Sequence, residues 1–375
     1  MKFQISDFRF QIHKPSNLQS AICNLQSPRI LIVRTDRMGD VILSTPVIRA
    51  LREALPKAYL GMMVDRANRE LVEGHPDLDV VILYDKQGRQ RGWWSTLQFA
   101  KVLRSHRFDT ALILHSTNRI VLVSFLAGIH RRIGYARRLS WLLTDRLPYV
   151  KREGNRHELD YNLDLLRLLG IQPLNRTLAI PTTPSHSEKV DVFFRQQGIN
   201  PQRPIVVLHP GASCPSKRWP AERFARVADQ VIERYGWQVV VVTGPQETAF
   251  GEGVTVQMRQ PAFQAFGVFS LGELACFLKR SKCLVSNDSG PVHLACAVGT
   301  PVVSIFGRWE RGLSPTRWGP TGPNSISLHH DVGCRPCLAH RCSIGFVCLK
   351  AVTIEEVLAA IEQVAGLHPV GKDET

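Results

Sequence analysis

The chain lacks the patterns that would assign a function directly. No apolar run is long enough to cross a bilayer, and the longest lies near residues 120–129. The first residues have no apolar core of the kind a signal peptide needs, so a cytoplasmic protein is expected. Neither half of the chain has G-x-G-x-x-G after its first predicted strand, and G-x-x-x-x-G-K-[ST] is missing. These absences argue against NAD-type and P-loop chemistry.

Acidic residues are scarce relative to basic ones. The 375 residues include 47 Lys and Arg against 32 Asp and Glu, a formal net charge of +15. Such a balance favours an anionic partner, which includes nucleic acid, acidic lipid or a phosphorylated substrate. A solvated basic surface explains the charge equally well.

Short buried-strand patterns alternate with helical periods along most of the chain. This alternation predicts an α/β fold with parallel sheets covered by helices. We expect residues 1–27, with their short degenerate repeats, to be a disordered extension. Two Rossmann-like domains are expected at 28–185 and 186–350, facing each other across a cleft. A C-terminal helix and tail follow at 351–375, and this helix is expected to pack back on the N-terminal domain.

One stretch, Cys283–Gly307, reads as strand, loop, short helix, loop and strand. Ser289 stands at the predicted helix start, Pro291 lies in the first turn, and Gly299 provides a left-handed stop. The start of a helix at the carboxyl end of a parallel strand favours phosphate binding. The pattern is common, so it gains meaning only from the rest of the chain.

Several motifs in order along the chain resemble glycosyltransferase family 9, the ADP-heptose:lipopolysaccharide heptosyltransferases. They are RTDRMGD at 34–40, HPGAS at 209–213, SKRWP at 216–220, TGPQE at 243–247 and SNDSGPVHLACAVGTPVVSIFG at 286–307. The resemblance runs from about residue 29 to residue 364. It implies a GT-B fold and an inverting transfer of heptose from ADP-heptose to a lipopolysaccharide core or related anionic glycolipid. No metal cofactor is implied, and no D-x-D pair ends a predicted strand.

The resemblance makes Asp40 the catalytic base that takes the proton of the acceptor hydroxyl. Asp36 is the nearby competitor. From the residues alone, a helix-capping or surface aspartate is the better interpretation of Asp40.

The resemblance also assigns the donor site. Lys217 is expected to offset charge on the departing diphosphate, and Ser213 to supply a hydroxyl contact. Glu247 is placed to accept hydrogen bonds from a ribose. Without the resemblance, Lys217 and Glu247 would be interpreted as solvated surface residues. Within Cys283–Gly307, the implied donor contacts are Asp288, Ser289, Gly290 and His293, although Asp-Ser-Gly is also an ordinary turn and cap.

Arg131, Arg132 and Arg137 surround a Gly-Tyr pair that resembles an element of the family's acceptor domain. Guanidinium groups suit a phosphorylated or carboxylated acceptor. Contact with an anionic inner membrane surface, or a solvated face, explains them almost as well.

Four of the nine cysteines, Cys334, Cys337, Cys342 and Cys348, fall within fifteen residues. Two close pairs suit tetrahedral zinc, but the spacing is unlike that of a zinc ribbon. Buried thiols or a labile disulfide remain alternatives.

Two other functions stay open at this point. One is a transferase or epimerase of similar fold that uses another nucleotide sugar. The other is a basic nucleic-acid-binding protein with a four-cysteine zinc module; the preferred interpretation predicts no nucleic-acid partner.

Overall fold

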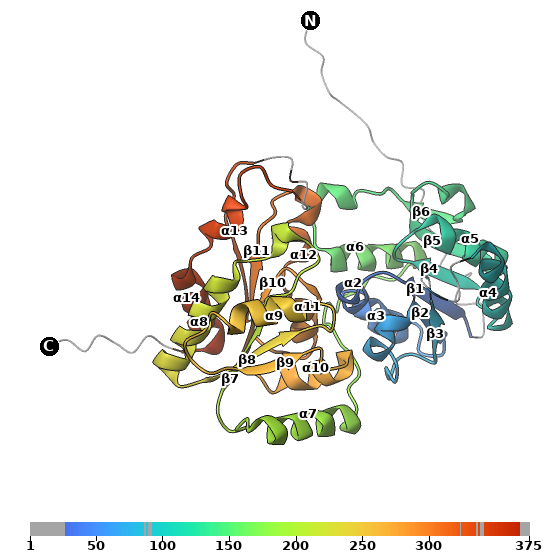
Figure 1. The fold of residues 1–375 in the computed structure, drawn as a ribbon. Coiled ribbons are helices and arrows are strands. Elements are labelled where there is room, and N and C mark those ends of the chain that lie inside the picture. The colour runs from blue at the N-terminus through green and yellow to red at the C-terminus, as the bar shows by residue number, and fades with distance from the viewer. Residues whose placement is uncertain are drawn as a thin grey trace, which may run out of the picture.

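The computed structural model describes residues 27–85, 88, 92–322, 324–334, 337 and 341–367. The predicted extension at 1–27 lies outside this range except for Ser27. Two α/β domains stand side by side (Figure 1). Among the described residues, no helix is long and apolar enough to span a membrane.

The N-terminal domain is built on a six-stranded parallel sheet in the order β3-β2-β1-β4-β5-β6, the strand order of a dinucleotide-type Rossmann sheet. Its strands are β1 (Arg29–Arg34), β2 (Tyr59–Asp65), β3 (Val80–Tyr84), β4 (Thr110–Ile113), β5 (Arg131–Tyr135) and β6 (Asp145–Leu147). Its α-helices are α2 (Met38–Ile42), α3 (Thr45–Ala54), α4 (Trp93–Ser105), α5 (Asn118–Leu126) and α6 (Glu158–Asp164).

The C-terminal domain repeats the plan with the parallel order β12-β11-β10-β7-β8-β9. Its strands are β7 (Ile205–His209), β8 (Gln238–Thr243), β9 (Phe263–Phe266), β10 (Cys283–Asn287), β11 (Val302–Phe306) and β12 (Ser325–His329). Its α-helices are α7 (Pro184–Gln197), α8 (Ala221–Tyr235), α9 (Thr248–Thr255), α10 (Leu271–Lys279), α11 (Gly290–Ala297), α12 (Pro315–Trp318), α13 (Val347–Ala351) and α14 (Ile354–Ala365). The predicted α/β class with two Rossmann-like domains is confirmed.

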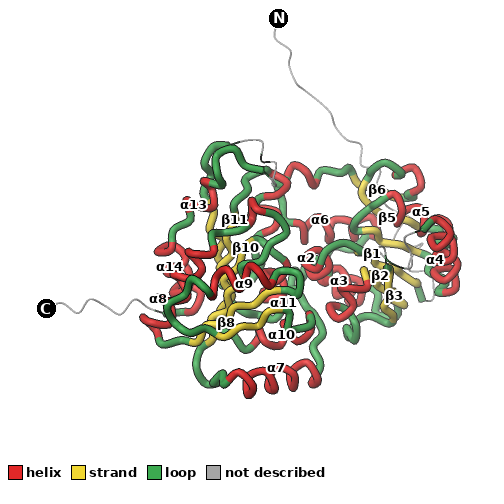
Figure 2. Tube along the Cα trace, viewed as in Figure 1, coloured by secondary structure: helices red, strands yellow, loops and turns green. Residues whose placement is uncertain are grey.

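The central strands form because their sequences are mostly apolar. Every residue of β7, β10 and β11 is buried, as expected for parallel strands covered by helices on both faces. Figure 2 shows yellow strands flanked by red helices in each domain. The two sheets divide between Leu147 and Ile205, and the predicted boundary at 185/186 falls between them, near the start of α7.

The last helix, α14, differs from expectation in its packing. Thr353 and Glu356 form a capping box at its start. However, α14 lies against α8, β10, β11 and β12 of its own domain, with Val357 and Ile361 in that domain's core. The expected return to the N-terminal domain is therefore wrong, because the apolar face of the helix is already buried on the C-terminal sheet.

Candidate active site between the two domains

The N-terminal half of the site forms where β1 ends and α2 begins. The sequence RTDRMGD reads as a loop, but Met38–Ile42 is a short helix that carries Asp40. Arg34, the last residue of β1, is buried and binds Asp40 through its Nη2. Its Nε donates to Asp36 Oδ1 at 2.7 Å. One guanidinium therefore fixes both aspartates of the motif.

A buried carboxylate on α6 completes this half. Glu158 Oε1 accepts from Arg34 Nη1 at 3.2 Å and from Lys151 Nζ at 2.7 Å. Its other oxygen, Oε2, accepts from Arg317 Nη2 at 2.7 Å. Arg317 lies on α12 of the C-terminal domain, so this ion cluster joins the two domains.

The three carboxyl groups of this cluster, on Asp36, Asp40 and Glu158, have very different pKa values. Burial raises the pKa of Asp40 to about 6; Arg34 opposes this shift, and the charges of Asp36 and Glu158 reinforce it. For Asp36 and Glu158, burial raises the pKa, but neighbouring cations lower it by more. Arg34 and His115 hold the pKa of Asp36 well below its usual range, while Lys151, Arg34 and Arg317 lower that of Glu158 to about 2. Of these three, only Asp40 exchanges a proton near neutral pH.

The C-terminal half is organised around an ion pair at the carboxyl ends of its strands. Lys217 Nζ lies 2.8 Å from Asp288 Oδ2 and donates to the Asp288 carbonyl at 3.2 Å. Arg308 Nη2 lies 3.5 Å from the same carboxylate. Arg308 is 7% exposed, and among the described residues its Nε has no hydrogen-bond partner. Two cations therefore converge on Asp288, one of them with an unused donor.

Glu247 stands nearby, at the start of α9. His209 Nε2 lies 3.6 Å from its Oε2, and the hydrogen bond to His209 lowers the pKa of Glu247 despite partial burial. The carboxylate lies so close to Gly211 that a Cβ there would overlap it. A side chain at this glycine of HPGAS would therefore displace the Glu247 carboxylate from its present position.

Helices α2 and α11 bring the two halves into contact. The terminal methyl of Met38 lies against Gly290, and a Cβ on Gly39 would stand 2.7 Å from the ring of His293. Burial lowers the pKa of His293 to about 3, with smaller contributions from His157 and Lys217. His293 is therefore neutral at physiological pH and adds no charge for an anionic ligand.

A cavity of about 750 Å³ lies between the domains. It is lined by the predicted base and by every predicted donor residue: Asp40, Ser213, Lys217, Glu247, Asp288, Ser289, Gly290 and His293. Residues separated by up to 253 positions are thus gathered around one space. The volume suits a nucleotide-sized ligand.

The three predicted acceptor arginines do not line this cavity. Arg131 pairs with Asp145 and donates to the Leu168 carbonyl. Arg132 donates to backbone carbonyls, including that of Leu142 at 2.6 Å. Only Arg137 approaches the cavity, with its Nη1 3.4 Å from Nε2 of the lining residue His115.

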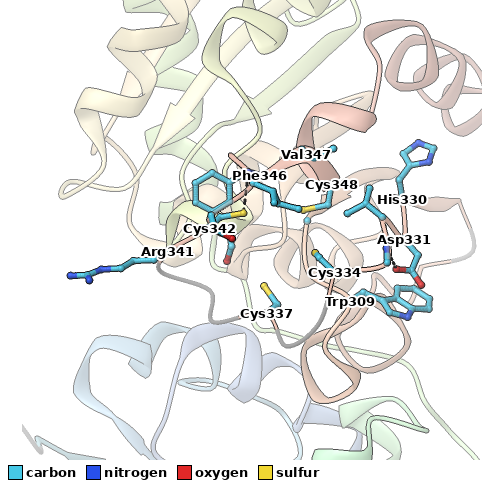
Figure 3. Close-up of a pocket in the computed structure, with 16 residues that line it drawn as sticks. Trp309, His330, Asp331, Cys334, Cys337, Arg341, Cys342, Phe346, Val347 and Cys348 are labelled. Atoms are coloured by element: carbon cyan, nitrogen blue, oxygen red, sulfur yellow. Dashed lines mark hydrogen bonds between the residues drawn. The ribbon is translucent and has the colours of Figure 1, made fainter.

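The four clustered cysteines line a second cavity of about 630 Å³, which Trp309 and Phe346 also line (Figure 3). Cys334, Cys337, Cys342 and Cys348 are all free thiols, so the disulfide alternative is wrong in this structure. Among the described residues, no three His, Cys, Asp or Glu side chains are arranged to hold a metal ion. The zinc interpretation therefore has no support in the geometry.

Several residues of the site were not predicted to be functional from the sequence. They are Arg34, Lys151, Glu158, His209, Arg308 and Arg317. Arg34 and His209 carry a usable signal, because each is a polar residue that directly follows a run of apolar strand residues. Lys151, Glu158, Arg308 and Arg317 look like ordinary surface charges in the sequence, and only the packing of distant segments brings them together.

Similarity to known proteins agrees with the geometry of the site. A family model described as glycosyltransferase family 9 (heptosyltransferase) matches residues 96–347. The chain is similar to lipopolysaccharide heptosyltransferase 2 of Escherichia coli (strain K12), with 26% identity over 298 residues, covering 76% of this chain and 85% of the relative.

Solved structures agree over almost the whole chain. The glycosyl transferase family 9 protein of Veillonella parvula superposes with a TM-score of 0.81 at 27% identity, covering 91% of this chain and 98% of that one. The E. coli ADP-heptose LPS heptosyltransferase II gives a TM-score of 0.74 at 22% identity, with 90% and 98% covered. At that identity, the second likeness speaks for the fold alone.

Proposed function

Because the chain belongs to glycosyltransferase family 9, we propose that it transfers a heptose from ADP-heptose to a lipopolysaccharide core or a related anionic glycolipid. The family makes the protein a glycosyltransferase and decides against the nucleic-acid-binding alternative. The donor is proposed because relatives of the same fold are named for ADP-heptose. The observation that carries the proposal is the cavity with Asp40 on one wall and the Lys217–Asp288 pair on the other.

In the proposed reaction, Asp40 acts as general base. Its carboxylate takes the proton of an acceptor hydroxyl while that oxygen attacks the anomeric carbon of the donor sugar. The new carbon–oxygen bond forms as the bond to the β-phosphate oxygen breaks, so ADP leaves with the bonding electrons and the configuration inverts. A pKa of about 6 suits this task, since the group is ionised at neutral pH yet basic enough to accept a proton.

Departure of ADP leaves negative charge on the diphosphate, and two cations are proposed to offset it. Lys217 and Arg308 already lie together at Asp288. The N–H groups of Ser289 and Gly290, at the start of α11, are proposed as further donors. Fixed positive charges in a closed site perform the role that a divalent cation has in other transferases, so the reaction is proposed to need no metal.

The acceptor is proposed to enter from the N-terminal side. Arg137, against the cavity-lining His115, is its best-placed anion contact. Arg131 and Arg132 are occupied structurally, so direct contact by them requires release of their present partners. An acceptor anchored in lipid also implies that the enzyme works at the inner face of the cytoplasmic membrane.

Nucleotide release from different donors tests the assignment. We expect ADP to be released from ADP-heptose in the presence of a heptose-deficient lipopolysaccharide core, and no nucleotide from UDP- or GDP-sugars. Turnover with UDP-sugars alone would overturn the heptose assignment while leaving the family intact. Chelation by EDTA should leave the rate unchanged, and a loss of activity that Mg²⁺ restores would contradict the metal-independent mechanism.

A further inference from the structure

Four large apolar side chains are exposed on adjoining elements of the N-terminal domain. Trp94 is 78% exposed and Val102 54% on α4, Phe125 is 45% exposed on α5, and Trp141 is 71% exposed on the 3-10 helix η2 (Ser140–Leu142). Helix α5 packs against both α4 and η2. Figure 1 shows α4 and α5 together on the flank of the domain turned away from the C-terminal domain. We call these elements the α4–α5 face.

The same segment concentrates positive charge. Residues 92–144 contain eight Lys or Arg and a single acidic residue, Asp109, and Asp145 directly after them pairs with Arg131. Asp109 faces elsewhere, since its Oδ2 accepts from the backbone N–H of Arg29 at 2.7 Å. In the described part of the chain, Lys101 and Arg138 have no ion-pair partner. Arg132 lies over the ring of exposed Phe125, 5.3 Å from its centre. The apolar groups are therefore bordered by uncompensated cations.

We propose that the α4–α5 face docks on an anionic lipid bilayer. Exposed tryptophans and a phenylalanine bordered by Lys and Arg are the combination that sits at a membrane interface, with rings among the head groups and cations on lipid phosphates. A second copy of the chain would bring the same positive charge to the contact and be repelled. Nucleic acid would use the cations and rings, but Val102 offers no surface for stacking bases.

The place of this face in the fold fits the proposed function, on which its biological meaning rests. Helix α5 begins at Asn118, three residues after the cavity-lining His115. Arg119 at its start donates to the Gly92 carbonyl before α4 at 2.9 Å. The cleft ends of both helices therefore lie together at the acceptor side. A protein docked by this face holds its acceptor half at the surface where a lipid-anchored sugar is displayed.

Vesicle sedimentation with the full-length protein tests the docking. The probes are vesicles of phosphatidylcholine alone and vesicles with about three parts in ten phosphatidylglycerol. We expect binding to the anionic vesicles only, weakened by high salt. Trp94→Ser combined with Trp141→Ser, and Lys101→Glu combined with Arg138→Glu, should each weaken binding about tenfold or more.

Matched controls use the same substitutions elsewhere. Val256 is 81% exposed in the C-terminal domain, so Val256→Ser should leave binding unchanged while Val102→Ser weakens it. Lys57→Glu combined with Arg226→Glu makes the same charge change on other surfaces and should have a smaller effect than the pair on the face. Thermal melting of each variant checks that folding is intact.

Nucleotide release from ADP-heptose with a detergent-dispersed acceptor separates this proposal from the proposed function. The face variants should keep that activity and lose vesicle binding. Equal vesicle binding by wild type and face variants would overturn the docking surface. So would wild-type binding to RNA or DNA without vesicle binding, or a dimer that the tryptophan variants dissociate. Vesicle binding without turnover of ADP-heptose would instead refute the donor assignment and leave the surface standing.

Discussion

The two halves of the cleft use their charges differently. On the N-terminal side, three carboxyl groups cluster around Arg34, Lys151 and Arg317. Burial raises the pKa of Asp40, whereas the neighbouring cations lower those of Asp36 and Glu158. On the C-terminal side, two cations gather on the single carboxylate of Asp288. One half is therefore suited to move a proton and the other to hold an anion. The variants below test this division.

Substitution of the base should have the largest effect. Asp40→Asn keeps the shape but removes the proton acceptor, so turnover should fall by about 10²–10⁴-fold. Binding of ADP, measured by calorimetry, should stay within about twofold because the proposed nucleotide contacts lie in the other domain. Asp191→Asn, which alters an exposed ion pair with Arg280, is the control and should leave both quantities unchanged.

Removal of the donor-side lysine should affect chemistry and nucleotide binding together. Lys217→Ala takes away a cation from the departing diphosphate, and turnover should fall by about 10²-fold with weaker ADP binding. Lys282→Ala is the matched control, since this exposed lysine precedes β10 at the opposite end of the same sheet. Unchanged ADP binding in Lys217→Ala would argue against its place at the diphosphate.

Loss of the shared carboxylate should reduce stability more than chemistry. Glu158→Gln leaves Lys151 and Arg317 without their buried partner, which should cost about 3–5 kcal/mol in the free energy of unfolding. It should also move the acid limb of the activity profile to lower pH, because the charge of Glu158 helps to raise the pKa of Asp40. Glu53→Gln at the exposed pair with Arg49 should change stability by no more than about 0.5 kcal/mol.

The smallest effect is expected from a pair of glycine substitutions that tests the contact between the two domains. Gly154 and Gly198 both have positive φ, at 62° and 71°, so alanine strains either backbone similarly. A Cβ on Gly154 would also overlap the Arg311 carbonyl across the domain interface, whereas Gly198 has no neighbour within 4 Å. Of the two variants, only Gly154→Ala should lower kcat/KM, by about tenfold. Equal kinetics in the two variants would show that this contact does not position the site.

Much of this site could be predicted from the sequence. The apolar strands β7, β10 and β11, the stop at Gly299 and the capping box of α14 are set by local preferences. Asp40 and the donor residues were predicted through the resemblance of their motifs to glycosyltransferase family 9, and these motifs lie at the ends of strands, where parallel sheets place ligands. Their assembly around one cavity was expected from the fold.

The remainder depends on contacts between distant segments. Glu158 looks like an ordinary acidic residue in the first turn of a helix, and Arg317 like one arginine among many. Their meeting across 159 positions follows from domain packing. Arg131 and Arg132 are the opposite case. Their sequence pattern predicts contacts with the acceptor, but their side chains bind neighbouring residues of their own domain. Helix α14 was misplaced for the same reason, because its apolar face fits either domain as far as the sequence shows.

The pH dependence of kcat/KM is the most direct test of the proposed proton transfer. Asp40 must be ionised to accept a proton, so activity should rise about tenfold per pH unit below a pKa of about 6 and level off above it. Neither Asp36 nor Glu158 titrates in that range. A profile that is flat between pH 5 and pH 7, or an acid limb near the ordinary value of an aspartate at about 4, would contradict the account.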